Sequence, residues 1–222
     1  MPRSSRKGHR MRVVIFAGGT YQPGKASQKA LMDADMLIAA DSGAATALNL
    51  GHVPAYVVGD LDSLDTQLVE QLRGRGSQII TAAAEKNETD TELAVQTAIE
   101  QGATEIILLG ALGGERFDHT IANVFLLAGF DTIPMKIIDG PATCWLLRGP
   151  GATTIEGKSG DLLSLFPLVG DATGVRTQGL YYPLYSETLR FGKPRGVSNA
   201  LTGERAEVSL ASGLLLVIHT EM

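Results

Sequence analysis

The segment "AYVVGDLDSLDTQLVEQLRGR", residues 55–75, decides the fold class. It begins with a short apolar run typical of a buried strand and ends with the apolar spacing of a helix. Between these two parts, Asp60 and Asp62 place two negative charges directly after the strand. Such a pair costs free energy when it is poorly screened, because the two carboxylates repel each other. The pair therefore either faces open water or holds a cation.

The same alternation of strand and helix extends over the first 140 residues. The expected strands are nearly continuous in apolar character, as in sheets that helices cover on both faces. This pattern predicts a doubly wound, mostly parallel α/β sheet. The expected strands are 12–17, 36–40, 55–59, 77–81, 105–110 and 134–139. The expected helices are 27–34, 43–50, 65–75, 88–102 and 119–130.

From Pro141 onward the helical spacing is lost, and short apolar runs alternate with Gly, Pro and Ser-rich turns. This pattern predicts a small β-sandwich. Its expected strands are 143–148, 152–156, 161–168, 174–180, 206–210 and 213–220. We therefore expect a flexible basic leader (1–10), an α/β domain (11–140) and a β-sandwich domain (141–222).

Composition excludes several classes of function. No apolar run approaches the roughly 20 residues that span a bilayer. The single cysteine, Cys144, cannot form an internal disulfide, which favours a reducing cytoplasm. The first 12 residues carry five bases and no acid; without them, 14 Lys and Arg stand against 24 Asp and Glu, a net charge of −10. A body this acidic is a poor match for nucleic acid, so we expect neither a nucleic-acid nor a membrane partner.

Polar residues follow four of the expected strands at their carboxyl ends. Because ligands collect outside this edge of a parallel sheet, we expect these side chains to converge there. They are Asp41 and Ser42 after the second strand, Asp60 and Asp62 after the third, Lys86, Asn87, Thr89 and Asp90 after the fourth, and Gly113, Gly114, Arg116 and Asp118 after the fifth.

Several of these residues also have a purely structural interpretation. Asp41 with Ser42 would cap the helix at Gly43, Asp62 with Ser63 would cap the helix that starts near Asp65, and Thr89 with Glu92 forms a capping box. Asp60 has no helix to cap, which favours a metal for the pair with Asp62. Together these residues indicate phosphoryl-type transfer. The carboxylates would hold Mg²⁺, the basic groups would hold a polyphosphate, and the glycines would let the backbone approach it. The sequence contains no Walker motif, so a Walker-type ATPase is excluded.

The ordered motifs "ADSGA", "VGDLDS", "KNETDTELA", "GALGGERFDHTIAN", "GLYYPL" and "VSNA" resemble the thiamine pyrophosphokinase family from Met11 to the C-terminus. The resemblance implies an α/β domain followed by a thiamine-binding and dimerising β-sandwich, and a homodimer. It also implies that ATP donates a pyrophosphoryl group to the hydroxyl of thiamine with Mg²⁺, giving thiamine diphosphate and AMP.

The resemblance also implies roles for individual residues. Magnesium would be held by Asp60, Asp62 and Asp90, which with Arg116 and Asp118 form the catalytic set. ATP and its phosphates would be bound by Asp41, Ser42, Lys86, Asn87, Thr89, Gly113, Gly114 and Arg116. Thiamine would meet Ser198 and Asn199 of the neighbouring subunit.

This chain departs from the family pattern at three positions. Asn87 stands where an acid is usual, Glu115 is inserted before Arg116, and Ala200 replaces a common glutamate. No residue is assigned as the general base: Asp118 or a metal-held aspartate is a candidate, whereas His119 opens a helix and is interpreted as a structural neighbour.

Two other functions stay open. One is a dehalogenase-type phosphatase or phosphotransferase in which Asp60 is the nucleophile. The other is a thiamine-binding module that has lost turnover.

Overall fold

The computed structural model describes residues 10–83, 85, 87–130 and 132–222, and the chain divides into two compact units. The amino-terminal unit ends at Gly140, and the carboxy-terminal unit runs from Pro141 to Met222. Lys86 and the first nine residues of the expected leader lie outside the described residues. In the part of the chain that is described, no helix is both long and apolar enough to cross a membrane.

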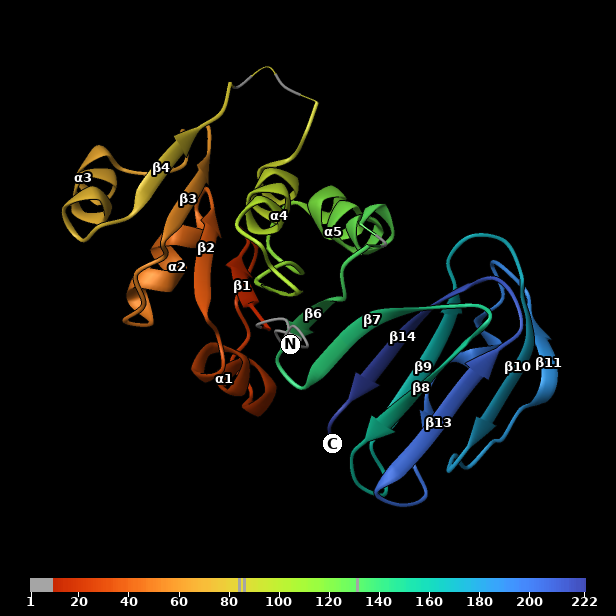
Figure 1. Ribbon diagram of the computed structural model, residues 1–222. Coiled ribbons are helices and arrows are strands. Elements are labelled where there is room, and N and C mark those ends of the chain that lie inside the picture. Colours follow the sequence, from red (N-terminus) through yellow and green to blue (C-terminus); the bar gives the residue numbers. More distant parts are fainter. Residues whose placement is uncertain (1–9, 84, 86, 131) are drawn as a thin grey trace, which may run out of the picture. The chain divides into compact units, whose positions relative to one another are not determined.

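The amino-terminal unit contains a six-stranded parallel sheet in the order β6-β5-β1-β2-β3-β4 (Figure 1). Its strands are β1 (Arg12–Phe16), β2 (Met36–Ala40), β3 (Tyr56–Gly59), β4 (Gln78–Thr81), β5 (Glu105–Leu109) and β6 (Met135–Asp139). The strand order reverses at β1, because β2 lies on one side of it and β5 on the other. Such a reversal leaves a crevice at the carboxyl ends of the strands.

Five helices accompany this sheet, as the sequence predicts. They are α1 (Lys25–Met32), α2 (Gly43–Asn49), α3 (Thr66–Gly74), α4 (Asp90–Glu100) and α5 (Phe117–Gly129). Helix α4 packs on β1, β2 and β3, while α1 and α5 contact β6. The central strands are buried: every residue of β5 is buried, as are Val13–Phe16 of β1. Because both faces of these central strands are buried, apolar residues occupy successive positions along them instead of alternating with polar ones.

The carboxy-terminal unit is a sandwich of two antiparallel sheets. One sheet has the order β12-β9-β14-β7 and the other β11-β10-β13-β8. Leucine and valine side chains from both sheets, such as Leu163 and Val217 from one and Val175 and Val208 from the other, form a single buried core. The strands are β7 (Ala142–Arg148), β8 (Gly151–Glu156), β9 (Leu162–Pro167), β10 (Ala172–Gln178), β11 (Tyr185–Leu189), β12 (Asn199–Ala200), β13 (Arg205–Leu210) and β14 (Leu214–Thr220).

Two strands of this unit, β11 and β12, were not expected from the sequence. Both lie at the edge of their sheets. Most residues of β11 ("YSETL") are exposed, so the strand lacks the apolar alternation that a half-buried strand shows. β12 is only two residues long, too short to leave a pattern.

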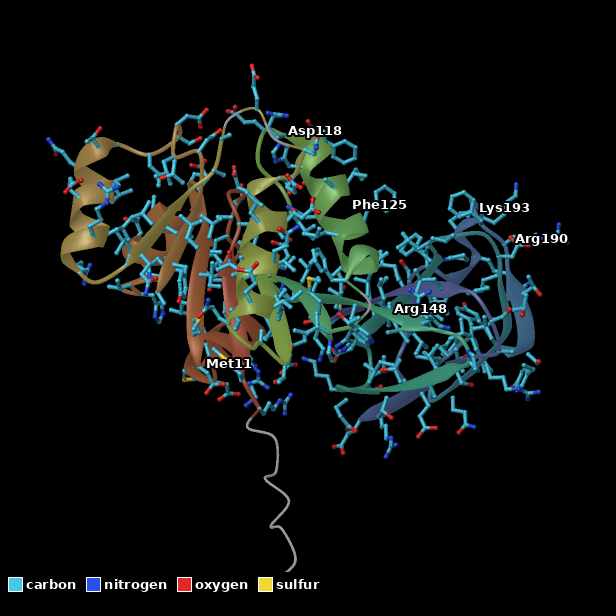
Figure 2. All side chains as sticks on the ribbon, turned by 45° about the horizontal axis from the view of Figure 1, so that its top comes forward. Met11, Asp118, Phe125, Arg148, Arg190 and Lys193 are labelled. Atoms are coloured by element: carbon cyan, nitrogen blue, oxygen red, sulfur yellow. The ribbon has the colours of Figure 1, made fainter. Side chains whose placement is uncertain are left out.

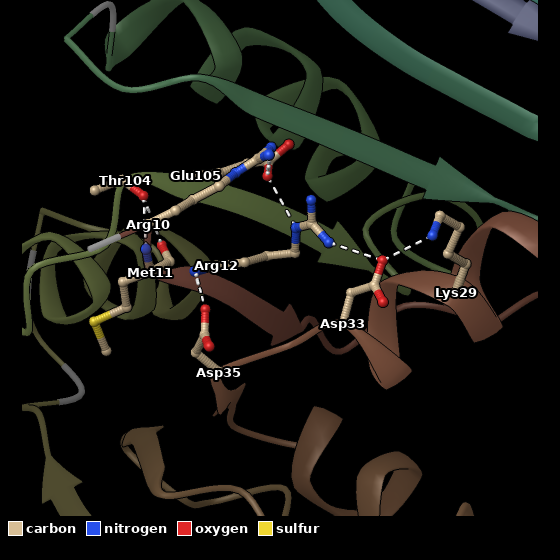
Figure 3. Close-up of polar contacts among 8 residues, drawn as sticks. All are labelled: Arg10, Met11, Arg12, Lys29, Asp33, Asp35, Thr104 and Glu105. Atoms are coloured by element: carbon tan, nitrogen blue, oxygen red, sulfur yellow. Dashed lines mark hydrogen bonds and ion pairs between the residues drawn. The ribbon is translucent and has the colours of Figure 1, made fainter. Parts of the chain in front are cut away.

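A network of charges ties the amino-terminal ends of β1 and β5 together (Figure 3). The carboxylate of the buried Glu105 accepts hydrogen bonds from Arg10 at 2.7 Å and from Arg12 at 2.9 Å. Arg12 also reaches Asp33 at 3.1 Å, which Lys29 contacts at 2.9 Å. Burial raises the pKa of Glu105, but the bonds from Arg12 and Arg10 outweigh burial and leave it below its ordinary value of 4.5.

Replacing Glu105 by Gln should lower the free energy of unfolding by about 1–3 kcal/mol at pH 7, because two guanidinium groups lose their buried anion. Since the folded pKa lies below the ordinary one, this stabilisation is complete above about pH 5 and is lost as the pH falls through the folded pKa. Urea unfolding from pH 7 to pH 3 checks this, with the exposed Glu100→Gln as control. A difference between Glu105→Gln and the unsubstituted protein that stays constant over this range would contradict the role of the ion pair.

Candidate active site

Residues that follow the carboxyl ends of β1, β2, β3, β4 and β5 surround a cavity of 360 Å³ in the amino-terminal unit. The cavity lies where the strand order reverses, as expected for a doubly wound sheet. Of the residues that the sequence placed here, it is lined by Asp41, Ser42, Asp90, Gly113, Gly114 and Arg116.

Three carboxylates meet beside this cavity. Asp41, Asp60 and Asp62 each offer an oxygen that lies within 4.8 Å of the other two. The sequence grouped Asp60 and Asp62 with Asp90 and assigned Asp41 to the phosphates, whereas in the structure Asp41 joins the pair. Asp90 lies close by: a Cβ built on Gly59 would be 3.1 Å from the Asp41 Cβ and 3.2 Å from the Asp90 carboxylate.

The buried Asp41 is the innermost member of this carboxylate cluster. Its Oδ1 atom is buried and has no hydrogen-bond partner among the described residues. Burial raises the pKa of Asp41, hydrogen bonds from Ser63 and the Ser42 backbone oppose this, and the negative charges of Asp90 and Asp60 add to the rise. A buried anionic oxygen without a donor is costly, so this site fits a hard cation with carboxylate ligands.

The backbone is bent to bring these acids together. Asp41 has φ = 43° and Leu61, between Asp60 and Asp62, has φ = 63°. Both lie in the left-handed region that non-glycine residues rarely adopt, a strain that gathers at functional sites. The Asp62 N–H donates to the Asp60 Oδ1 at 3.3 Å and closes the turn.

The expected capping interactions are only partly present. Thr89 caps α4 by accepting from the Glu92 N–H at 3.2 Å, as predicted. The Ser42 side chain makes no capping bond to α2, and the cap of α3 is Asp65. Ser42 therefore occupies the N-cap position of α2, as the structural interpretation expected, but its side chain does not stabilise the end of the helix.

Arg116 and Asp118 form a two-pronged ion pair at the start of α5, where Figure 2 shows Asp118. The Arg116 Nε donates to Asp118 Oδ1 at 3.0 Å and its Nη2 to Oδ2 at 2.6 Å. Both side chains are exposed, and the pair uses two of the five N–H donors of the guanidinium, so the other three can still meet a ligand. The hydrogen bonds from Arg116 lower the pKa of Asp118 to about 2.

Several residues around the cavity were missed. Gly18 and Gly19 line it directly after β1, and a Cβ on Gly19 would lie 2.6 Å from the Gly110 carbonyl oxygen. The rule that found the other loops, polar or glycine residues at the carboxyl end of a strand, would have found this pair too. The missed side chains in the lining are Ser63, Thr91 and Asn123, and the lining also contains Glu115 and His119, which the sequence analysis had noted. Five site residues predicted in this unit, although described, are not part of the lining: Asp60, Asp62, Asn87, Thr89 and Asp118.

A second cavity, of 430 Å³, lies in the carboxy-terminal unit. Buried leucines, including Leu163 and Leu165, and the exposed Tyr182 and Tyr185 line it. Ser198 and Asn199, which the sequence assigned to thiamine, are part of this lining and not of the first cavity.

The fold and these two cavities define a protein of two units. The α/β unit carries an acidic ligand site, and the β-sandwich has its own, largely apolar cavity. Residues 27–138 match the family model described as thiamin pyrophosphokinase, catalytic domain, and residues 152–215 match the thiamin pyrophosphokinase vitamin B1 binding domain. The chain therefore belongs to the thiamine pyrophosphokinase family.

Known proteins agree with this assignment. The chain is 31% identical to thiamine pyrophosphokinase of Bacillus subtilis (strain 168) over 82% of this chain and 86% of that protein. It is similar to the crystal structure of thiamine pyrophosphokinase from Bacillus subtilis, with a TM-score of 0.83, 27% identity, and coverage of 95% of this chain and 99% of that one. The thiamin pyrophosphokinase structure from Geobacillus thermodenitrificans gives a TM-score of 0.82, 28% identity, and coverage of 96% and 98%.

Replacing Arg116 by Ala should return the pKa of Asp118 from about 2 to near its ordinary value of 3.8, because the fork that stabilises the carboxylate is gone. Carbon-13 NMR titration of the Asp118 carboxyl measures this. Arg73→Ala, which removes an exposed arginine paired with Glu70, is the matched control and should leave Asp118 unchanged. An Asp118 pKa that stays near 2 in Arg116→Ala would mean that the ion pair does not form in solution.

Proposed function

We propose that this protein transfers a pyrophosphoryl group from ATP to the hydroxyl of thiamine, giving thiamine diphosphate and AMP. The bond formed joins the thiamine oxygen to the β-phosphorus, and the bond broken joins that phosphorus to the oxygen that leaves with AMP. Membership of the family supports the reaction. The observation that carries it to this chain is the carboxylate cluster around the unpartnered Asp41 Oδ1, at the edge of the 360 Å³ cavity.

Asp41, Asp60 and Asp62 would hold Mg²⁺, and Asp90 lies beside them as a further acid. A bound Mg²⁺ supplies positive charge to the phosphates of ATP. The family resemblance assigned the third position to Asp90; the geometry favours Asp41, whose buried oxygen has the greater need of a cation.

The remaining groups of the cavity would bind and orient the phosphates. Arg116 presents a planar guanidinium whose donors match phosphate oxygens. Gly113 and Gly114, with φ values of 71° and 85°, let the backbone approach a ligand closely. Ser42 lies beside them, and Thr89 and Asn87 belong to the loop before α4. These groups position the substrate and cancel charge, which accounts for most of phosphoryl-transfer catalysis.

The cavity of the carboxy-terminal unit would take thiamine. Its leucines suit the apolar edges of the vitamin, and the tyrosine rings suit an aromatic cation. Tyr181, Tyr182 and Tyr185 are 67%, 68% and 75% exposed, so they are not part of the core, in contrast to Trp145, which packs against it.

We also propose that the chain acts as a homodimer in the cytoplasm. The exposed tyrosines and the stripe of Phe117, Ile121 and Phe125 on α5, where Figure 2 shows Phe125, are apolar surfaces that a second copy would cover. The buried thiol of Cys144 suits a reducing compartment. Light scattering that gave the 23.5 kDa of a single chain would contradict the dimer.

Incubation with ATP, Mg²⁺ and thiamine should release AMP and thiamine diphosphate in equal amounts. Asp62→Ala should lower this rate on the order of 10²–10³-fold and weaken Mg²⁺ binding measured by calorimetry, because one carboxylate of the cluster is lost. Asp65→Ala, which removes the nearby cap of α3, is the matched control and should keep the Mg²⁺ affinity.

Near-normal turnover by Asp62→Ala at saturating Mg²⁺ would show that the metal assignment is wrong. ADP in place of AMP would refute pyrophosphoryl transfer, and a trapped phosphoaspartate at Asp60 would point to the dehalogenase-type reaction. Thiamine binding without AMP release would identify a module that has lost turnover.

A further inference from the structure

The side-chain amide of Asn199 is already occupied by the protein backbone. Its Nδ2 donates to the Tyr182 carbonyl oxygen at 2.7 Å, and its Oδ1 accepts from the N–H groups of Tyr182 and Ala200, both at 3.0 Å. A carboxamide has two N–H donors and two acceptor lone pairs. Both lone pairs and one donor are therefore used, and a ligand could engage the Oδ1 atom only by displacing a backbone bond.

These bonds fix one end of a short segment, Tyr181–Leu184. The Tyr181 N–H donates to the Ala200 carbonyl oxygen at 2.9 Å, so the backbone reinforces the contact that Asn199 makes with Tyr182. At the other end, the Leu184 N–H donates to Thr177 Oγ1 at 2.8 Å. Pro183 lies between the two anchors and restricts its own φ. The segment is thus held from both sides.

The turn before Asn199 is also specific. Ser198 has φ = 59°, in the left-handed region, and its N–H donates to Ser164 Oγ at 3.0 Å. Asn199 and Ala200 then pair with Leu163 and Leu162 of β9. Ser198 therefore forms the turn from which Asn199 enters the edge of the sheet.

The anchored segment Tyr181–Leu184 carries the aromatic ring of Tyr182. The ring packs edge-to-face against Tyr181, with 4.8 Å between the ring centres and an angle of 84°. Tyr182 lines the 430 Å³ cavity, and 68% of the residue is exposed. An exposed ring on a fixed backbone offers a flat aromatic surface at a small entropic cost of binding.

We propose that Asn199 is a positioning residue for thiamine: the backbone occupies its acceptor oxygen, and its amide fixes the Tyr182 backbone so that the Tyr182 ring contacts the vitamin. This inference rests on the proposed function and changes the role that the sequence gave to Asn199. Asn199 and Ser198 thus differ in role, although both line the cavity. The Asn199 side chain holds the Tyr182 backbone, a contact that is not described for the Ser198 side chain.

A double-mutant cycle tests the inference. Thiamine dissociation constants are measured by calorimetry for the unsubstituted protein, Asn199→Ala, Tyr182→Ala and the double variant. Each single change should raise the constant about tenfold, the scale of a lost aromatic contact to a cation. The double variant should bind as Tyr182→Ala does, because Asn199 has nothing to position once the ring is gone. KM for thiamine should rise by the same factor in each variant, whereas KM for ATP should stay unchanged.

Gln178→Ala, an exposed change in β10, is the control and should leave thiamine affinity unchanged. Single effects that multiply to about a hundredfold in the double variant, or an Asn199→Ala protein with normal affinity, would overturn the inference while leaving the proposed function intact. If Asn199→Ala does not fold, Asn199→Asp, which keeps the acceptor oxygen and loses the donor to the Tyr182 carbonyl, replaces it in the cycle. An unsubstituted protein that binds no thiamine would overturn both the inference and the proposed function.

Discussion

Repulsion among three carboxylates held within 4.8 Å is the constraint on which the active-site account depends. At an effective dielectric constant of 20, two unit charges at this separation repel by about 3–4 kcal/mol, and water around the exposed Asp62 reduces this. A domain is stable by only about 5–15 kcal/mol in total. A cation held by the three carboxylates would relieve this repulsion, which is why we propose one here. The cation would also satisfy the Asp41 Oδ1 atom, which has no partner in the part of the chain that is described.

The fold places this cluster where backbone as well as side chains can meet a ligand. The strand order reverses between β2 and β5, and the loops after β1 and β5 approach so closely that a side chain on Gly19 would clash with the Gly110 carbonyl oxygen. Gly43 is equally confined, because a Cβ there would meet the Phe16 carbonyl oxygen. These glycines thus allow the backbone segments around the cavity to pack closely. The charged side chains come from the segments that follow β2, β3, β4 and β5.

The sequence predicted the fold well where a local pattern carries it. Continuous apolar strands and the acids that follow them located all six parallel strands and the converging loops, because both patterns are local in the chain. It predicted less where the decisive contact is distant in the chain. The hydrogen bonds of Asn199 to Tyr182, 17 residues away, leave no local pattern, and they are the basis on which we propose a positioning role. The same holds for Asp41, because the left-handed backbone at Asp41 and Leu61 that accompanies its approach to Asp60 and Asp62 leaves no pattern in the sequence.

The most direct test of the account is a crystal structure with Mn²⁺ and an ATP analogue that cannot be cleaved between its α- and β-phosphates. Anomalous scattering would locate the metal independently of any activity. We predict a peak about 2.1 Å from carboxylate oxygens of Asp41, Asp60 and Asp62, with the phosphates beside it. A well-occupied nucleotide with its metal bound elsewhere, and these three carboxylates without one, would contradict it.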